Sequence, residues 1–316
     1  MKVKVSNLAF SNNSYLVEQL KNEFADAEIN SAGLRMNDDA LVDYFFDAEG
    51  VVVGLELITP QILDRLPNLK IIAKYGVGLD NIDLQACRER DIIVGWTGGV
   101  NKRSVAEMSL GFMLALSRNL YLTSNQLKDS VWNKAGGQQL TGKTIGILGC
   151  GNIGKELIQL LAPFQCNIII NDIIDQDEFA SKNSVTCVTK EILFSTADVI
   201  SIHTPLTSET LNLFNMEVFE RMKPNAILIN TARGGIINEK DLKQALQNNI
   251  ISGAALDVYE VEPPLDQEFL ALANLICTPH TGGNSYEAVV AMGLSALSHL
   301  VNYKNNKEDR TILKYE

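Results

Sequence analysis

Short, nearly continuous apolar runs recur along the chain and alternate with stretches in which apolar residues return every three or four positions. Such runs are typical of parallel strands covered on both faces, and the intervening pattern is typical of the covering helices. In the first hundred residues the predicted strands are 3–5, 51–53, 69–73 and 92–94, and the predicted helices are 14–24, 38–46 and one that starts at Thr59-Pro60. Thr59 suits the N-cap and Pro60 the first helical position. The pattern predicts a small doubly wound α/β domain.

A second set of apolar runs begins after residue 140. The predicted strands there are 144–148, 167–171, 198–202, 226–230, 253–257 and 275–277. The apolar helix predicted at 101–116 is too hydrophobic for a free surface, so we expect it at a domain or subunit interface. Residues 119–140 are predicted to be irregular and to form an arm around a partner. A final helix over 284–302 is expected to return to the first domain.

The strand at 144–148 leads into a glycine-rich turn with the pattern G-x-G-x-x-G. Its glycines are Gly149, Gly151 and Gly154, and a helix that ends at Pro163 follows. In this context the first glycine allows a tight turn, the second lets backbone approach a pyrophosphate, and the third lets helix and strand pack closely. The free amides of the helix N-terminus would face the phosphates.

Asp172 ends the next strand, about twenty residues after the middle glycine. A carboxylate at this place binds the ribose hydroxyls of a dinucleotide and repels a 2′-phosphate. The sequence therefore predicts NAD rather than NADP as the cofactor.

Charged side chains follow the later strands, at the edge where ligands bind in open parallel sheets. They are Arg233 after 226–230, Asp257 and Glu262 after 253–256, and His280 after 275–277. A base for the hydroxyl proton, an acid to orient that base and a cation for a carboxylate suit hydride transfer at a carbinol.

Three further side chains have less specific roles. His203 follows the strand at 198–202 and is expected to flank the adenine pocket. His299, in the last helix, is expected at the surface. Cys150, inside the glycine loop, has no partner for nucleophilic chemistry in its neighbourhood and is interpreted as a packing residue.

Composition excludes several classes of protein. The net charge is −11 and no dense Lys/Arg block occurs, which argues against nucleic-acid or anionic-membrane partners. No apolar run reaches membrane-spanning length, and Met1-Lys2-Val3 opens a strand rather than a signal peptide. The five cysteines are scattered without a C-x-x-C pair, so we expect a reduced cytoplasmic protein with no disulfide framework and no metal site.

Taken together, the motifs resemble the D-isomer-specific 2-hydroxyacid dehydrogenase family. The stretches that carry the resemblance are 75–81, 140–147, the glycine loop, 203–207, 230–235, 255–260 and Pro279-His280. The resemblance implies two doubly wound parallel-sheet domains, a Rossmann NAD-binding domain and a flavodoxin-like substrate domain, with the active site in the cleft. It implies that residues 1–99 and 286–316 form the substrate domain and 100–285 the NAD-binding domain. A homodimer built on residues 100–140 is implied as well.

The resemblance also implies roles for single residues. Arg233 would hold the substrate carboxylate and carbonyl, His280 would exchange the proton, and Glu262 would orient His280. Asp257 would contact the nicotinamide carboxamide. The further cofactor-binding residues implied are Asn152, Ile153, His203, Thr204, Pro205, Thr231, Ala232 and Gly282, and those implied for substrate are Lys74, Tyr75, Gly76, Val77 and Gly78.

The branch that the sequence most resembles holds D-3-phosphoglycerate dehydrogenases and their short relatives. This resemblance implies an NAD-dependent dehydrogenase of a D-2-hydroxy acid of the 3-phosphoglycerate type, and with it a place in serine biosynthesis. Animal members of that branch carry an arginine where this chain has Gly54, so the phosphate site rests on Lys74 and Arg103. The chain ends at Glu316, so no regulatory C-terminal domain is expected.

Two alternatives stay open. The first is a reductase of glyoxylate, hydroxypyruvate or another 2-keto acid. The second, of another class, is an NAD(H)-sensing corepressor, which the acidic composition and the lack of tails disfavour. Formate dehydrogenases are disfavoured because they typically carry glutamine where this chain has Glu262.

Overall fold

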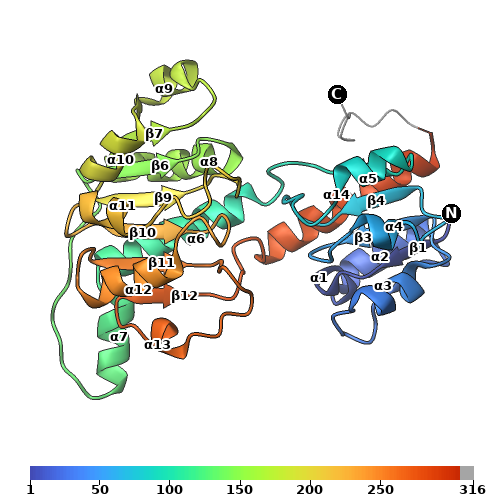
Figure 1. Cartoon of the computed structure of the whole chain (residues 1–316), viewed down its shortest axis with the longest axis horizontal. Helices are drawn as coiled ribbons and strands as arrows, with labels where there is room; N and C mark the ends of the chain where they lie inside the picture. The colour runs from blue at the N-terminus through green and yellow to red at the C-terminus, as the bar shows by residue number, and fades with distance from the viewer. Residues whose placement is uncertain (307–316) are drawn as a thin grey trace. The chain divides into compact units, whose positions relative to one another are not determined.

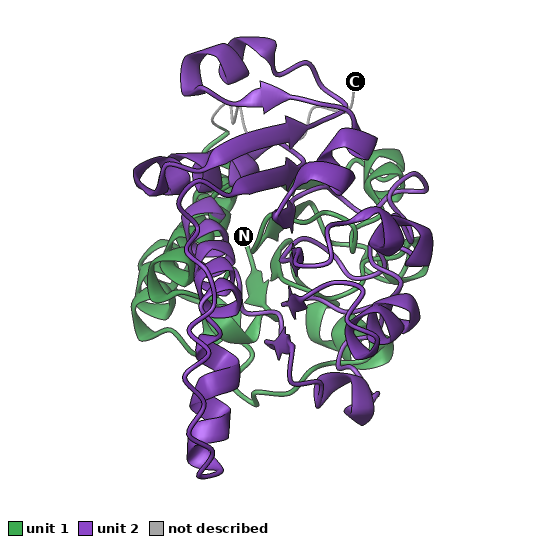
Figure 2. Ribbon diagram, turned by 90° about the vertical axis from the view of Figure 1, so that its left-hand side faces the viewer, with its two compact units in different colours: residues 1–101, 283–316 green, residues 102–282 purple. Residues whose placement is uncertain are grey.

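The computed structural model describes residues 1–306 and consists of two compact units (Figures 1 and 2). Unit 1 comprises Met1–Asn101 and the segment that begins at Gly283, and unit 2 comprises Lys102–Gly282. The assignment of substrate binding to unit 1 and of cofactor binding to unit 2 stays a prediction. The predicted extension of the first domain to residue 316 lies in part outside the described residues.

The sheet of unit 1 is entirely parallel and has the order β2-β1-β3-β4-β5. Its strands are β1 (Val3–Val5), β2 (Glu28–Ile29), β3 (Gly50–Val53), β4 (Ile71–Lys74) and β5 (Ile93–Gly95). This is the strand order of flavodoxin-like sheets. Val53 pairs with Lys74, so the loops that follow β3 and β4 start side by side.

Helices cover both faces of this sheet. They are α1 (Leu8–Ser11), α2 (Ser14–Glu23), α3 (Asp38–Phe45), α4 (Pro60–Leu63), α5 (Leu84–Glu89) and α14 (Tyr286–Lys304). One apolar core lies under α1, α2 and α14, and the other lies under α3, α4 and α5. The Thr59 hydroxyl accepts from the Ile62 N–H with Pro60 as the first helical residue, as the sequence predicts.

The prediction that His299 lies at the surface is wrong. His299 is 2% exposed, and its Nε2 lies 3.1 Å from the Thr97 hydroxyl. On α14 it shares a face with Met292, Ala296 and Leu300, which pack on the sheet. A β-carbon on Gly95 would lie 2.6 Å from the His299 ring carbon Cγ, so a residue without a side chain makes the space for this buried ring.

The sheet of unit 2 is also entirely parallel, with the order β12-β11-β10-β9-β6-β7-β8. Its strands are β6 (Thr144–Leu148), β7 (Asn167–Asn171), β8 (Thr186–Cys187), β9 (Val199–Ile202), β10 (Ile227–Asn230), β11 (Gly253–Leu256) and β12 (Leu275–Cys277). Strand order reverses between β6 and β9, and in such sheets ligands bind beyond the carboxyl ends of the strands at this point.

Two layers of helices cover this sheet as well. One face carries α6 (Lys102–Ser117), α8 (Asn152–Leu161) and α9 (Asp177–Asn183), and a short 3-10 turn, Ala162–Phe164, follows α8. The other face carries α10 (Lys190–Thr196), α11 (Met216–Arg221), α12 (Glu239–Gln247) and α13 (Gln267–Leu270). The two predicted doubly wound sheets are therefore both present.

The prediction of an irregular stretch over 119–140 is wrong for its first part, because α7 (Leu120–Lys128) is a helix. This helix buries none of its residues, so the amphipathic pattern that marks a packed helix is missing from its sequence. It extends away from the sheet of unit 2 (Figures 1 and 2). Leu120, Leu127 and Trp132 are exposed along this segment.

Candidate active site

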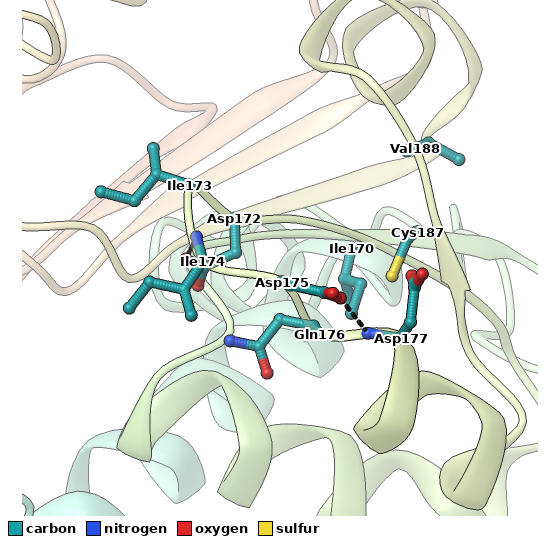
Figure 3. A pocket seen from close by; sticks show the side chains of 9 residues that line it. All are labelled: Ile170, Asp172, Ile173, Ile174, Asp175, Gln176, Asp177, Cys187 and Val188. Carbon is teal, nitrogen blue, oxygen red and sulfur yellow. Dashed lines mark hydrogen bonds between the residues drawn. The ribbon is translucent and has the colours of Figure 1, made fainter.

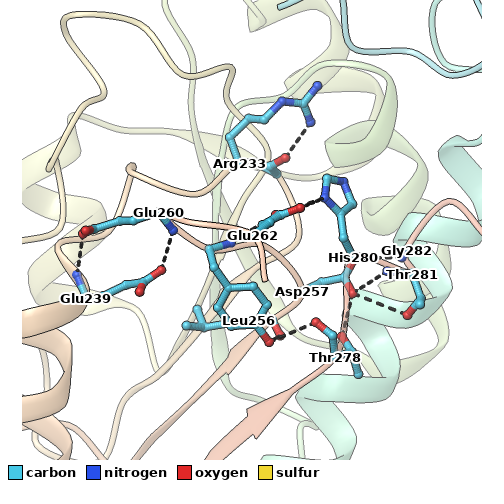
Figure 4. Close-up of polar contacts among 12 residues, drawn as sticks. Arg233, Glu239, Leu256, Asp257, Glu260, Glu262, Thr278, His280, Thr281 and Gly282 are labelled. Carbon is cyan, nitrogen blue, oxygen red and sulfur yellow. Dashed lines mark hydrogen bonds and ion pairs between the residues drawn. The ribbon is translucent and has the colours of Figure 1, made fainter. Parts of the chain in front are cut away.

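Three loops meet at the carboxyl edge of the sheet of unit 2, where the strands end (Figure 4). They follow β10, β11 and β12, which are neighbours in the sheet. Asn230 pairs with Leu256 and Leu256 with Cys277, so the three strands end in register. This register brings together the loops that contain Arg233, Glu262 and His280.

His280 and Glu262 form a hydrogen-bonded pair. His280 Nδ1 lies 2.8 Å from Glu262 Oε2 and 3.0 Å from Oε1. A carboxylate only accepts hydrogen bonds, so Nδ1 has the proton and Nε2 is the nitrogen left for a ligand. The two side chains are 34% and 35% exposed, which leaves the pair accessible from solvent.

Asp257 holds the loop that contains His280. Its Oδ1 accepts from the Thr278 hydroxyl at 2.6 Å and from the Thr281 N–H at 2.8 Å, and its Oδ2 accepts from the Gly282 N–H at 2.7 Å. These contacts lie on both sides of His280, whose φ of +54° is unusual for a residue other than glycine. The buried Asp257 carboxylate therefore stabilises a backbone conformation that costs energy locally.

The loop of Arg233 is shaped from within by Asn230, a buried residue that ends β10. Its side-chain amide donates to the Arg233 carbonyl at 2.8 Å, and its side-chain oxygen accepts from the Ala232 N–H at 3.0 Å. Arg233 Nη1 donates to the Ala232 carbonyl at 2.7 Å. The Thr231 hydroxyl lies 3.0 Å from that of Ser109 on α6. Asn230 is not among the site residues predicted from the sequence, although an amide that ends an apolar strand at this edge is a signal for such a role.

The glycine loop has the close approaches that a dinucleotide site requires. Gly149 has φ +93°, and a β-carbon there would lie 2.7 Å from the carbonyl carbon of His203. A β-carbon on Gly154 would collide with the Gly149 carbonyl oxygen. Gly151, in contrast, faces open space. It is the N-cap of α8 and has no side chain that could accept a hydrogen bond from the main-chain N–H groups of the first helical turn, which starts with Asn152 and Ile153. Those amides are available to an anion such as a pyrophosphate.

Asp172 is bonded to this loop. Its Oδ2 accepts from the Cys150 N–H at 2.6 Å, and its Oδ1 accepts from the Ile174 N–H at 2.9 Å. Asp172 also lines a pocket with Asp175 and Asp177 (Figure 3). Three carboxylates around one pocket oppose a 2′-phosphate, whereas a ribose hydroxyl can donate to Asp172.

Two buried polar atoms beside the glycine loop have no partner among the described residues. They are His203 Nδ1 and Thr204 Oγ1, next to Pro205 in the loop that follows β9. Burial lowers the pKa of His203 to about 3, so the ring is neutral, and its Nε2 lies 2.9 Å from the Ser201 hydroxyl. Such atoms are normally satisfied by a ligand or water, and with the glycine loop and Asp172 they fit a dinucleotide.

Cys150 lies inside the glycine loop. Burial raises the pKa of its thiol to about 11, which agrees with its interpretation as a packing residue.

The predicted substrate residues of unit 1 lie in the loop after β4. Gly76 has φ +113°, and residues 76–78 are partly exposed. Tyr75 is buried in the apolar core and stacks edge-on against Phe10. Lys74 is only 4% exposed, and its ammonium donates to the Gly54 carbonyl and to Asn81 Oδ1. The structure thus places Lys74 inside unit 1, where it fixes the loop after β3.

Residues 1–306 contain neither a candidate metal site nor a helix that could span a membrane. No cluster of three or more His, Cys, Asp or Glu side chains in this range is arranged to bind a metal ion. Within the same range, none of the helices has both the length and the apolar character needed to span a bilayer.

Comparison with known proteins identifies the family. Residues 110–282 match the model of the D-isomer specific 2-hydroxyacid dehydrogenase NAD-binding domain. A hydroxypyruvate reductase of Thermotoga maritima is 36% identical over 86% of this chain and 90% of its own length. A D-3-phosphoglycerate dehydrogenase of Methanocaldococcus jannaschii is 39% identical over 82% of this chain, but the chain spans only 50% of that relative.

A solved structure agrees with these relatives. The NAD-dependent formate dehydrogenase of Staphylococcus aureus, in complex with NAD, is 29% identical and superposes with a TM-score of 0.84 over 100% of this chain and 99% of its own. The NAD-binding family model and this NAD complex agree with the cofactor predicted from Asp172. On the fold, the glycine loop and these matches, the chain belongs to the D-isomer specific 2-hydroxyacid dehydrogenase family.

Proposed function

We propose that this protein interconverts a 2-keto acid and a D-2-hydroxy acid with NAD, using His280 as the acid–base group. The observation that supports this best is the His280–Glu262 pair at 2.8 Å, which joins the loops after β11 and β12 beside the loop of Arg233 (Figure 4). A half-exposed imidazole with one nitrogen fixed by a carboxylate is suited to proton exchange at the other nitrogen.

In the reductive direction, His280 Nε2 donates its proton to the carbonyl oxygen of the keto acid. In the oxidative direction, neutral Nε2 takes the hydroxyl proton. Glu262 stabilises the positive charge of the protonated ring that reduction requires, and it orients the ring in both directions of the reaction. When bound, NADH would donate the hydride in reduction, and NAD would accept it in oxidation.

Arg233 is proposed to bind the substrate carboxylate and to polarise its carbonyl. A guanidinium can make two parallel hydrogen bonds to a carboxylate, and Asn230 fixes the backbone on which Arg233 stands. In unit 1, the main-chain amides of residues 76–78 are proposed to bind a carboxylate, because Gly76, with φ +113°, turns this loop at the carboxyl end of β4.

For the substrate we favour an unphosphorylated keto acid such as hydroxypyruvate or glyoxylate. The Lys74 ammonium is buried against Gly54 and Asn81, and the Arg103 guanidinium lies 3.0 Å from the buried carboxylate of Glu156. The loop after β3 presents Glu56 between two exposed leucines, Leu55 and Leu57. Both predicted cations are therefore engaged in contacts with other protein groups, which supports the preference for an unphosphorylated substrate. A second candidate is a 3-phosphoglycerate substrate, and with it serine biosynthesis, because the phosphoglycerate dehydrogenase noted above is 39% identical.

For assembly and location we propose a cytoplasmic homodimer formed through α7 and the chain around it. Exposed apolar side chains on that segment favour association, and all five cysteines are free thiols. The net charge of −11 supports the absence of nucleic-acid and membrane partners.

Turnover of a substrate panel tests the function. Hydroxypyruvate, glyoxylate and 3-phosphohydroxypyruvate are each supplied with NADH, and native protein is compared with His280→Ala. We expect native turnover that is highest for an unphosphorylated acid, and loss of most turnover with nearly native NADH binding in the variant. NADH binding by native protein without turnover of any keto acid would instead support the corepressor alternative.

A further inference from the structure

Tyr259 contacts the three loops that contain the proposed catalytic residues. It follows β11, is 6% exposed and packs in the core on one face of the sheet of unit 2. It belongs to the sequence motif over 255–260, but neither the sequence nor the proposed mechanism gives it a role. Each of its three polar groups is bonded to or packed against a different loop.

The hydroxyl group acts on the loop of His280. It donates to the Thr278 carbonyl at 2.9 Å and lies 3.2 Å from the Leu256 carbonyl. The same Thr278 carbonyl accepts the main-chain N–H of His280 at 3.1 Å. One oxygen atom therefore joins the Tyr259 hydroxyl to the backbone of His280, at the residue whose φ of +54° needs support.

The main-chain N–H acts on Glu262. It lies 3.3 Å from Glu262 Oε1, the oxygen that is 3.0 Å from His280 Nδ1. Tyr259 is therefore linked to both members of the acid–base pair: to Glu262 directly through its backbone, and to His280 through its hydroxyl and the Thr278 carbonyl.

The main-chain carbonyl acts on the loop of Arg233. A β-carbon on Gly234 would overlap the Tyr259 carbonyl oxygen, so the two backbones are packed as closely as a glycine permits. Gly234 directly follows Arg233, and this contact limits how far the Arg233 loop can move toward Glu262.

From these contacts we propose that Tyr259 is a positioning residue, which fixes the distance between His280 and Glu262 through its hydroxyl group. The effect on catalysis rests on the proposed acid–base role of His280. If the Tyr259 ring only filled the core, Tyr259→Phe would leave catalysis unchanged, because phenylalanine fills the same space.

Tyr259 remains a donor at neutral pH. Burial raises the pKa of its hydroxyl above the ordinary range, and the neighbouring Cys277 thiol and Asp257 carboxylate act in the same direction. A change in the pH profile after its substitution therefore reports on the His280–Glu262 pair and not on titration of Tyr259 itself.

The first test compares Tyr259→Phe with Tyr44→Phe. Tyr44 is a matched control, since its hydroxyl also donates to a backbone carbonyl, that of Val5 at 3.3 Å, but in unit 1. We expect kcat for hydroxypyruvate reduction to fall about three- to tenfold in Tyr259→Phe, as for the loss of one neutral hydrogen bond. The alkaline limb of its pH profile should move to lower pH, while the Kd for NADH stays native. Tyr44→Phe should keep the native kcat and profile.

The second test needs no turnover. The chain has three histidines, so the imidazole proton resonances can be assigned by comparison with His280→Ala and followed against pH by NMR. We expect the His280 signals to titrate at lower pH in Tyr259→Phe than in native protein, with the His203 and His299 signals unmoved. An unmoved His280 titration would overturn the inference even if the protein proved not to be an enzyme.

The two tests separate the possible failures. Native kinetics and a native pH profile in Tyr259→Phe, with His280→Ala inactive, would reject the role of Tyr259 and leave the proposed function intact. A lower melting temperature with an unmoved profile would also reject it, because the hydroxyl would then be purely structural. A shifted His280 titration in a protein that turns over no keto acid would reject the proposed function and keep the positioning contact.

Discussion

The imidazole of His280 and the carboxylate of Glu262 are held 2.8 Å apart although they come from loops after different strands. The carboxylate favours the protonated ring, and Glu262→Gln keeps the shape while it removes the charge. Reduction needs the protonated ring, so the reductive activity of the variant should be lost at lower pH than that of native protein. Oxidation needs the neutral ring and should persist to lower pH. The measurement is kcat/KM against pH in both directions.

The control for this experiment is Glu217→Gln, on the exposed face of α11, where the glutamate pairs with Arg221 in the same helix. Its profile should match that of native protein. If the Glu262→Gln profile is equally unmoved, Glu262 does not act on the catalytic base, and the proposed acid–base pair is wrong.

Asp257 should be needed for both stability and catalysis. Asp257→Asn replaces one acceptor by a donor next to the N–H groups of Thr281 and Gly282, and leaving a buried group unsatisfied costs about 1–3 kcal/mol. Because these bonds fix the loop of His280, kcat should fall as well. Asp198→Asn is the matched control: that carboxylate also accepts a main-chain N–H, from Thr144, but at the opposite edge of the sheet. It should lower the urea midpoint without changing kcat, and an equal loss of kcat would contradict the role of Asp257.

Much of this fold could be predicted from sequence because parallel strands buried on both faces are apolar throughout. The runs ending at Asn230 and Cys277 are examples, and their ends place the site residues. α7 could not be predicted, since a helix with no buried face has no apolar period. The burial of His299 could not be predicted either, because its side chain occupies space left by Gly95, a residue about two hundred positions away.

The site shows the same division. The order of strand ends predicts that Arg233, Glu262 and His280 lie at one edge, since that depends on local pattern and on the general handedness of such sheets. The left-handed backbone of His280 and the bonds that Asp257 and Tyr259 make to its loop depend on side-chain geometry across β11 and β12. A pattern of residue types does not contain that information.

Cofactor choice should depend on more than one carboxylate. Asp172→Ser should narrow the preference for NADH over NADPH, and addition of Asp175→Ser should narrow it further, because both line the same pocket. Asp172→Asn removes the charge but keeps an acceptor for the Cys150 N–H. It therefore shows whether cofactor preference depends on the charge of Asp172 or on the loop position that this bond maintains. The measurement is the ratio of kcat/KM for the two cofactors. Asp26→Ser, an exposed acid in unit 1, is the control for net charge, and equal use of both cofactors by native protein would contradict the role of Asp172.

The proposed dimer should depend on apolar side chains of α7 and the residues that follow it. Trp132 is 78% exposed and Leu127 is 55% exposed, values that burial in a partner would explain. The double variant Leu127→Asp, Trp132→Ser should sediment as a monomer at concentrations where native protein is a dimer. Leu265→Ser, at a side chain that is 80% exposed elsewhere in unit 2, should not change the sedimentation coefficient. A native protein that is already monomeric would contradict the proposal.

Lys74 should stabilise unit 1 rather than select a phosphorylated substrate. Its ammonium donates to the Gly54 carbonyl and to Asn81 Oδ1, so Lys74→Met should lower stability by about 1–3 kcal/mol, as for a polar group left buried without its partner. Because the ammonium is buried in these contacts, KM for hydroxypyruvate and for 3-phosphohydroxypyruvate should rise by similar factors. Asn81→Ala, which removes Oδ1, the acceptor for Lys74, and two bonds from the Asn81 amide to the loop after β3, should show the same pattern. Lys70→Met, at an exposed lysine just before β4, should change neither KM nor stability. If Lys74→Met raises KM for the phosphorylated acid alone, a loss of about 1.5–3 kcal/mol of binding would show that Lys74 reaches the phosphate. The preference for an unphosphorylated substrate would then be wrong.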